Sequence, residues 1–393
     1  MRPRLLQIIS TRDSTGIEKQ LFMLAEGLPR DQFDFHICDL SSGGTNVSPV
    51  LGATATPGAI ATHAWQCRSG PRQPDPNTSD IPITVISNRW KYDPRTFWEL
   101  KRLVERLRPD LIHAWMPTAN AYALAVAKAS GVKRFVAGFC RIEPFKSGPR
   151  LAIDRYIGKH SVQLTTNCTG MRDFYIRKGL PAEKFCIIPS GVEPFSPSTA
   201  TRRQLLAELG LPENSRLIGM VSRLLLRNRV KDAIWAADLL KVIRKDVHLL
   251  VFGEGLHRDQ LERFRDQVRI ADLVHFLGRR SDLPRLMPHF DLLWSTNPYE
   301  GQSSFVLEAM ACGIPVVAGD TPAMRDLVVH QQTGFLVPIG DRAGFARHAY
   351  QIIEDPLLAN RLGQSAREHA QREFSPSKMI AGHVEMYRKL LDS

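Results

Sequence analysis

The stretch at residues 290–320, FDLLWSTNPYEGQSSFVLEAMACGIPVVAGD, constrains the fold more than any other part of the sequence. The apolar run at 290–295 predicts a buried strand, and the polar turn after it leads into a helical segment at 304–311. Gly313 ends that helix, and the β-branched run at 314–320 predicts a second strand. Strand, helix and strand in this order predict a βαβ unit of a parallel sheet, and therefore an α/β fold.

Two acids lie in this unit with seven residues between them, Glu300 in the turn and Glu308 little more than one turn into the helix. The turn follows the carboxyl end of a strand, where ligands bind in open α/β sheets. The helix start offers backbone N–H groups for a phosphate, and a serine that could cap the helix could also touch the anion. The candidate contacts there are Gly301, Gln302, Ser303, Ser304 and Phe305. The alternative is a pair of solvated acids on an ordinary crossover.

The size and composition favour a multidomain globular protein. At 393 residues the chain is long enough for two or three domains, and its 43% apolar and 23% charged content is ordinary for such proteins. No apolar run approaches the roughly 20 residues that span a bilayer. The run LLQIIS near the N-terminus is too short for the core of a signal peptide and indicates a first strand. We therefore expect a cytoplasmic protein.

The formal net charge of +12 favours anionic partners: sugar nucleotides, acidic membrane surfaces or nucleic acid. The sequence has no nucleic-acid-binding motif, and its arginines are not clustered with aromatic residues, so we expect no nucleic-acid partner. The six cysteines form no C-x-x-C pair and no metal-ligand spacing, which indicates reduced cysteines. The sequence also lacks an Asp-x-Asp pair, a frequent metal-binding pattern, so we expect no metal site and no cofactor.

The residues EGQSSFVLEAMACGIPVVAGDTPAMRDLV resemble the signature of the retaining glycosyltransferases of family 4 (glycosyl transferases group 1), which have the GT-B fold. That fold has two Rossmann-like, doubly wound parallel-sheet domains that face each other across a cleft. The resemblance implies that Glu300 contacts the donor sugar and that Glu308 binds the ribose. It implies a donor-binding C-terminal domain at 196–375, an acceptor-side N-terminal domain at 1–195, and a final helix at 376–393 that crosses back to the N-terminal domain.

Other positions of the second domain match the family in part. Arg223 follows a predicted strand and fits the arginine that holds the donor diphosphate. The family lysine five residues later is Asn228 here, with Arg227, Arg229 and Lys231 around it; of these we assign the second charge to Lys231. The alternative is a solvated basic turn. Gly278 and Arg279 resemble the loop that contacts the nucleotide base through its backbone.

The first domain matches the family less closely. Gly16 stands where the family has a Gly-Gly-x-Glu loop next to the donor phosphates or the acceptor, although a plain βα turn is the alternative. His113 matches the first histidine of a His-x-His pattern, and Trp115 replaces the second, so His113 is either a substrate contact or a structural residue. Arg141 ends another predicted strand and is a candidate substrate contact. Residues 41–80 are rich in turn-forming residues and predict a long surface loop or insertion.

These residues predict an enzyme that moves a sugar from a UDP-sugar or GDP-mannose to a hydroxyl of a glycan or lipid-linked acceptor, without a metal and with retention. Cell-surface polysaccharide or glycolipid synthesis is the expected setting, and the basic helices of the first domain could bring it to the inner face of an anionic membrane. The alternative is an inactive transferase-like protein that binds nucleotide sugars or serves as a scaffold. A Rossmann oxidoreductase is disfavoured because no G-x-G-x-x-G follows the first strand, and a phosphorylase-like enzyme would need a lysine-held cofactor that the sequence does not place.

Overall fold

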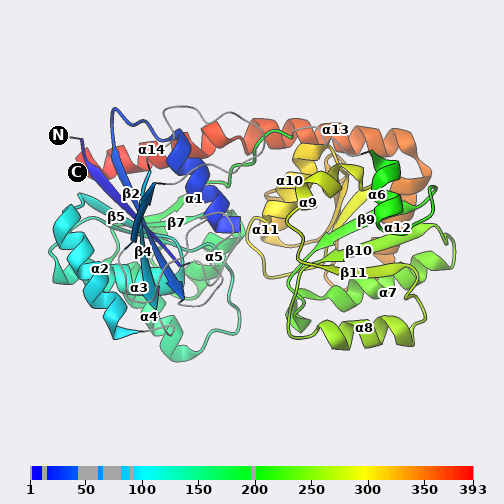
Figure 1. Cartoon of the computed structure of the whole chain (residues 1–393), viewed down its shortest axis with the longest axis horizontal. Coiled ribbons are helices and arrows are strands. Elements are labelled where there is room, and N and C mark those ends of the chain that lie inside the picture. The colour runs from blue at the N-terminus through cyan, green and yellow to red at the C-terminus, as the bar shows by residue number, and fades with distance from the viewer. Residues whose placement is uncertain are drawn as a thin grey trace. The chain divides into compact units, whose positions relative to one another are not determined.

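The computed structural model describes residues 2–10, 16–42, 61–64, 81–88, 93–195 and 201–392. The chain divides into two compact units (Figure 1). Unit 1 comprises Met1–Gly191 and Pro376–Ser393, and unit 2 comprises Val192–Ser375. The last helix therefore belongs to unit 1. The expected linker began at about residue 194, and the division in the structure falls between Gly191 and Val192.

Unit 1 is built on a sheet with the strand order β3-β4-β2-β1-β5-β6-β7-β8, in which all described pairs are parallel except β3 with β4. The strands are β1 (Arg4–Ile9), β2 (Asp34–Ser42), β3 (Ala61–Ala64), β4 (Pro82–Asn88), β5 (Leu111–Ala114), β6 (Phe135–Gly138), β7 (Gln163–Thr166) and β8 (Phe185–Ile187). The helices are α1 (Gly16–Gly27), α2 (Pro94–Leu107), α3 (Pro117–Ala129), α4 (Gly148–His160), α5 (Thr169–Arg177), the 3-10 helix η2 (Ala182–Lys184) and α14 (Pro376–Asp392).

The core of unit 1 joins the two ends of the chain. Leu21 and Leu24 of α1 share one buried apolar cluster with Met379 and Tyr387 of α14 and with strand residues such as Leu5. The contact between α1 and α14 is also visible in Figure 1, where the last helix lies beside the first. Removing α14 would therefore expose apolar surface of unit 1 to water.

Unit 2 has a parallel sheet with the order β11-β10-β9-β12-β13-β14. Its strands are β9 (Arg216–Val221), β10 (Val247–Phe252), β11 (Val274–Gly278), β12 (Leu292–Ser295), β13 (Val316–Gly319) and β14 (Gly334–Val337). Its helices are α6 (Arg202–Glu208), η3 (Leu226–Asn228), α7 (Val230–Lys241), α8 (Arg258–Gln267), α9 (Leu283–Leu286), η4 (Met287–His289), α10 (Ser304–Cys312), α11 (Pro322–Arg325), α12 (Arg342–Glu354) and α13 (Pro356–Glu373).

Helices cover both faces of the sheet in unit 2. Along β9, Leu217 enters the apolar cluster that includes α10, and the next residue, Ile218, enters the cluster that includes α7 and α12. Consecutive residues of a strand point to opposite faces, so both faces of the sheet are buried. This is the doubly wound arrangement that the sequence predicted, with the βαβ unit of β12, α10 and β13 at its centre.

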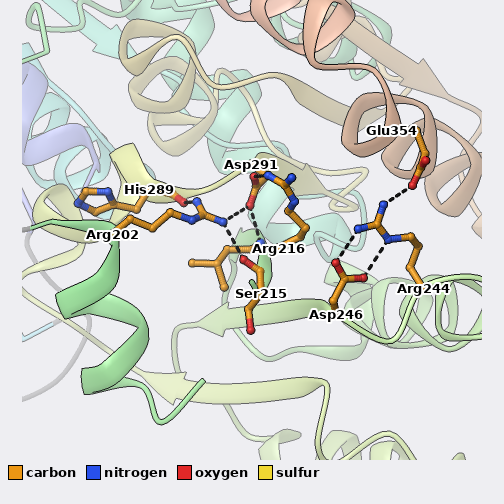
Figure 2. Close-up of polar contacts among 9 residues, drawn as sticks. Arg202, Ser215, Arg216, Arg244, Asp246, His289, Asp291 and Glu354 are labelled. Atoms are coloured by element: carbon orange, nitrogen blue, oxygen red, sulfur yellow. Dashed lines mark hydrogen bonds and ion pairs between the residues drawn. The ribbon is translucent and has the colours of Figure 1, made fainter. Parts of the chain in front are cut away.

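Ion pairs lie at the amino edge of this sheet, where its strands begin (Figure 2). Asp291, just before β12, accepts hydrogen bonds from Arg202 at 2.6 Å and from Arg216 at 3.1 Å. Arg244 pairs with Asp246, just before β10, at 2.5 Å and also with Glu354. The bond from Arg244 lowers the pKa of Asp246. These charges pair with one another at the edge opposite the expected ligand site, so we assign them a structural role.

The expected loop at 41–80 is only partly described. Residues 43–60 and 65–80 lie outside the described residues, and β3 within this segment pairs antiparallel with β4. The segment predicted to be a surface loop or insertion therefore contains a strand, β3. Of the described helices, none combines the length and the apolar content needed to cross a membrane.

Candidate active site

The strand order of unit 2 locates its ligand crevice. The chain runs from β9 outward to β10 and β11, then returns to the other side of β9 to form β12. A crevice at such a switch point lies outside the carboxyl ends of the two strands, here β9 and β12. The loops that follow these strands are residues 222–229 and 296–303, and they carry Arg223 and Glu300. The topology thus brings the two most important predicted residues to the same crevice.

A side-chain hydrogen bond joins the two loops. The Thr296 hydroxyl donates to the carbonyl of Asn228 at 3.0 Å. The Asn228 side chain, which is buried, donates in turn to the carbonyl of Arg223 at 2.8 Å and to Ser222 Oγ at 3.3 Å. Asn228 stands where the family has a lysine, and it holds the Arg223 loop in place instead of offering a charge. No pattern in the sequence indicates this role or that of Thr296.

The neighbouring loop after β10 approaches the Arg223 loop closely. A Cβ atom on Gly253, which has φ +122°, would lie 2.1 Å from the carbonyl oxygen of Ser222. The backbone N–H groups of Ser222 and Leu224 donate to Phe252 and Glu254 at 2.9 and 3.1 Å. Only glycine fits at residue 253. The Arg223 backbone is therefore fixed, and its side chain is exposed at the carboxyl edge.

The Glu300 loop leads into α10 as predicted. Tyr299 donates its backbone N–H to Asn297 Oδ1 at 3.0 Å, which shapes the turn before Glu300. Ser303 is the N-cap residue of α10, but its side chain makes no capping bond, so the predicted capping role is wrong for Ser303. The helix ends at Gly313 with φ +77°. Glu300 and Glu308 are both half-buried, one before and one within the helix.

The start of α10 is the predicted anion seat. Gly301 and Ser303 are buried, and Gln302, Ser304 and Phe305 are half-buried. The first N–H groups of any helix lack partners within the helix, and their dipoles favour a negative charge. Since α10 begins beside the switch point, this seat lies on the crevice that Arg223 also borders.

The three basic residues near Asn228 differ in the partners of their side chains. The Lys231 ammonium lies 4.1 Å from the ring centroid of Phe264 in α8, so the structure directs it onto an aromatic ring. Arg229, in the left-handed conformation with φ 57°, donates to Asp232 at 2.6 Å. Arg227 is exposed and has no ion-pair partner among the described residues. We therefore withdraw the assignment of the second charge to Lys231.

Gly278 ends β11 at the edge of the same sheet. Its φ of +67° disfavours a side chain, and a Cβ atom there would lie 2.7 Å from Glu254 Oε1, so the Glu254 side chain would have to move. Its carbonyl accepts the Gly253 N–H at 2.7 Å, which ties this loop to the one beneath Arg223. Arg279 follows and is exposed. Both residues remain predictions for contact with a base.

The predicted residues of unit 1 are described separately. His113 is fully buried in β5, and its ring nitrogens bond to the hydroxyls of Tyr387 at 2.8 Å and Thr165 at 3.1 Å. The structural alternative therefore holds for His113, and we withdraw its catalytic assignment. Gly16 is the first residue of α1. Arg141 follows β6, and its carbonyl accepts a bond from Tyr175 at 2.8 Å; Gly16 and Arg141 remain predictions.

Comparison with known proteins identifies the family. The model "Glycosyltransferase Family 4" matches residues 14–194, and the model "Glycosyl transferases group 1" matches residues 201–369. The chain is 26% identical over 330 residues to the putative glycosyltransferase EpsD of Bacillus subtilis, covering 80% of this chain and 86% of the relative. It is 22% identical over 388 residues to the UDP-Gal:alpha-D-GlcNAc-diphosphoundecaprenol alpha-1,3-galactosyltransferase of Escherichia coli, covering 95% and 93%.

A solved structure shares the fold of both units. The crystal structure of Anabaena Alr3699/HepE in complex with UDP-glucose matches with a TM-score of 0.81 and 21% identity, over 98% of this chain and 99% of that one. The two family models leave little of the chain unmatched between residues 14 and 369. The chain belongs to the family 4 glycosyltransferases, and it is an enzyme of the glycosyltransferase class with the GT-B fold.

Proposed function

We propose that the enzyme transfers a sugar from a nucleotide-diphosphate sugar, a UDP-sugar or GDP-mannose, to an acceptor hydroxyl with retention at the anomeric carbon and without a metal. The observation that carries this proposal is the tie between the Arg223 and Glu300 loops through Thr296 and Asn228. It brings a cation, a carboxylate and a helix start to one crevice. The names of the similar proteins, which include UDP-Gal and UDP-glucose, support a nucleotide-sugar donor.

The donor spans the crevice of unit 2. Its diphosphate binds at the start of α10, where N–H groups and the helix dipole favour an anion. The Glu300 carboxylate accepts hydrogen bonds from sugar hydroxyls, and the Glu308 carboxylate accepts them from the ribose. Backbone groups at Gly278 and Arg279 contact the base. Each role uses a chemical group that these residues carry, and each can be removed by one substitution.

The protein accelerates the reaction mainly by stabilising the charge that develops on the leaving diphosphate. The bond between the anomeric carbon and the diphosphate oxygen breaks, and negative charge develops on that oxygen. Fixed donors aimed at developing charge are worth about 3–4 kcal/mol each. Arg223 supplies one such charge. We assign the second to Arg227, which shares the η3 turn with Asn228 and is exposed.

The acceptor binds to unit 1, and it is a glycan or a lipid-linked saccharide of cell-surface polysaccharide or glycolipid synthesis. The name of the Escherichia coli relative, which contains a diphosphoundecaprenol, supports a lipid-linked acceptor. The net charge of +12 favours attraction to the acidic inner face of a membrane. Co-sedimentation with liposomes that increases with the fraction of acidic lipid would support this step, and binding that is independent of acidic lipid would remove it.

The central test is a donor panel. We expect one or a few of the common UDP- and GDP-sugars to raise the melting temperature of the full chain and to be turned over with an acceptor extract. Turnover should persist in EDTA, and NMR of the product should show the anomeric configuration of the donor. Stabilisation by a donor without any turnover would favour the inactive, transferase-like alternative. Stabilisation by no nucleotide sugar would contradict the proposal.

A pair of variants tests the second cation. Arg227→Ala should lower kcat by about tenfold or more, since it removes charge from the leaving group. Lys231→Ala, in the same segment, should leave kcat nearly unchanged because its ammonium lies on Phe264. A larger loss in Lys231→Ala than in Arg227→Ala would reverse the assignment.

A further inference from the structure

The chain passes between the two units twice, and the two passages are hydrogen-bonded to each other. It leaves unit 1 after Gly191 and returns to it at Pro376. On the unit 2 side, the Val192 N–H donates to the carbonyl of Phe374 at 2.7 Å. On the unit 1 side, a Cβ atom on Gly191 would lie 3.2 Å from the Cα atom of Pro376. These four residues therefore lie side by side, and together they form a joint.

One side chain of α1 binds the joint through both ends of its amide. Gln20 Nε2 donates to the carbonyl of Gly191 at 2.8 Å, and the Gly191 N–H donates to Gln20 Oε1 at 2.7 Å. Both distances are normal for N–H···O hydrogen bonds. An amide that donates to and accepts from the same residue makes the two bonds that a neighbouring strand would make. It therefore fixes both the position and the direction of the Gly191 backbone.

The Gly191 backbone depends on this side chain. Gly191 is buried, so its N–H and carbonyl need partners within the protein. Among the described residues, only Gln20 bonds to these two groups. A Cβ atom on Gly191 would also lie 2.6 Å from Met23 Sδ of α1, so the first passage packs directly on this helix. Without the Gln20 amide, the first passage would keep its packing on α1 and lose its hydrogen bonds.

The position of Gln20 in α1 links the joint to a predicted substrate contact. Gly16 is the first residue of α1, and Gln20 follows four residues later. Residues four apart lie on the same side of a helix, about one turn from each other. Another side of α1 is held in the core, where Leu21 and Leu24 share a buried cluster with α14. A helix held on two sides moves as one body with the joint, so a displacement of the joint also displaces Gly16.

We propose that Gln20 is a positioning residue for the transfer reaction: it anchors the joint to α1 and couples the joint to Gly16. Under the proposed function, on which this inference rests, the acceptor binds unit 1 and the donor binds unit 2. The acceptor hydroxyl then reaches the anomeric carbon only when the chain holds the two units precisely. A misplacement of about 1 Å can lower a rate about a hundredfold. Gln20 itself contacts no reacting atom, and it acts through the backbone that connects the units.

The first test compares two glutamine variants of the full chain. Gln20→Leu roughly keeps the size of the side chain and removes both bonds to Gly191. Gln163→Leu is the control, because Gln163 is also half-buried in unit 1 and its Nε2 donates to the backbone carbonyl of Lys184 at 2.6 Å, outside the joint. At a temperature where all chains are folded, kcat should fall about tenfold or more in Gln20→Leu and stay unchanged in Gln163→Leu. The KM for the nucleotide sugar should not change in either variant, because the donor binds unit 2.

Hydrogen exchange tests the joint without any measurement of activity. In Gln20→Leu the Gly191 N–H loses its acceptor directly, so faster exchange at Gly191 shows only that this bond is gone. The Val192 N–H keeps its own acceptor, Phe374, so faster exchange at Val192 shows that the two passages have loosened. We expect exchange at Val192 to be about fivefold faster or more in Gln20→Leu, and unchanged in Gln163→Leu. Mass spectrometry with fragmentation to single residues would measure both sites.

A conservative variant provides a rescue that depends on pH. In Gln20→Glu, the carboxylate can accept from the Gly191 N–H but cannot donate to the Gly191 carbonyl, whereas the protonated carboxyl can do both. The ratio of its kcat to the wild-type kcat should therefore be low at about pH 8 and should rise towards about pH 5. The same ratio for Gln20→Leu should not depend on pH.

Three results would overturn the inference: a wild-type kcat in Gln20→Leu, an equal loss of kcat in Gln163→Leu, or unchanged exchange at Val192 in Gln20→Leu. The first two would mean that Gln20 contributes nothing specific to transfer, and the third that it does not hold the joint. If the wild type turns over no nucleotide sugar, the proposed function is what fails. The exchange at Val192 then decides alone whether Gln20 anchors the joint.

Discussion

The carboxyl edges of the two sheets differ in charge. The crevice of unit 2 is bordered by Arg223, Arg227 and Glu300 and by the start of α10. A pocket at the carboxyl edge of the unit 1 sheet is lined by Trp115, Thr165, Asn167 and His383 among others, with no acid, lysine or arginine among its described lining residues. One region therefore presents charged side chains at its strand ends, and the other presents none. The same topology thus provides two chemical environments through the residues placed at its strand ends.

Of the variants that test this difference in charge, we expect the largest effect from removing the Glu300 carboxylate in unit 2. Glu300→Gln should lower transferase kcat by about a hundredfold or more, since a positioned charged group is removed from the reacting sugar. Its melting temperature should stay that of the wild type. Glu213→Gln is the control, because Glu213 pairs with Arg203 on the exposed surface of the same unit. Equal activity of the two variants would contradict the site.

Gly253→Ala tests whether the Arg223 loop is held by close backbone contact. A strained left-handed residue costs about 1–3 kcal/mol, and the clash with Ser222 should add to that cost and displace Arg223. Gly210→Ala also places a side chain at positive φ, here +66°, but its Cβ would meet no atom within 4 Å. Urea unfolding and kcat should therefore show a larger loss in Gly253→Ala. Similar losses in both would mean that strain alone accounts for the effect.

Tyr387→Phe tests the equivalent support in unit 1. The hydroxyl lies between Gln7 and His113, so its removal leaves two buried groups without a partner and should cost about 1–3 kcal/mol of unfolding free energy. Tyr350→Phe in unit 2 should cost much less, because the Tyr350 hydroxyl has no side-chain hydrogen bond within the described part of the chain and the residue is only partly buried. If urea unfolding gives the same loss for both, the hydrogen-bond chain does not support the pocket.

The neutral histidines of unit 1 predict a pH dependence. Burial lowers the pKa of His383 to about 4 from 6.5, so the unfolded chain binds this proton more readily than the folded one. The stabilisation is fully present above pH 6.5 and is lost as the pH falls from 6.5 towards 4, by at most about 1.4 kcal/mol per pH unit. Urea unfolding across this range should be less steep in His383→Phe. An identical slope in the variant would contradict the buried neutral state.

Salt gives the smallest effect and the most direct comparison. Raising the ionic strength screens exposed charges, so affinity for a nucleotide sugar should fall by roughly two- to fivefold. The loss of unfolding free energy in Tyr387→Phe should not change with salt, because the Tyr387 hydroxyl bonds to two uncharged groups, Gln7 and His113. Calorimetry with a nucleotide sugar and urea unfolding at two salt concentrations would measure both. Equal salt dependence would erase the contrast between the two regions.

The sequence predicted those features of the fold and the site that depend on residues close together in the chain. The β12, α10 and β13 unit, the glycine that ends α10 and the positions of Glu300 and Glu308 follow from one continuous stretch. Side-chain directions that depend on distant partners were not predictable. His113 matched a family histidine, but its ring is bound by Tyr387, 274 residues away. Lys231 matched a needed charge, but Phe264 in another helix receives its ammonium.

The unit 1 pocket was missed for the same reason. Its wall is assembled from the ends of several strands and from α14, and no short motif joins Thr165, Thr166 and His383. A buried histidine in a helix far along the chain carries no signal of its own in the sequence.

The return of α14 to unit 1 has a consequence for how the protein is made. Unit 2 is one continuous segment, so a ribosome has delivered all of it before the last helix emerges. Unit 1 is begun before unit 2 and completed after it, because Tyr387 and His383 follow unit 2 in the sequence. A nascent chain halted before Pro376 would hold all of unit 2 and a unit 1 that still lacks part of its core.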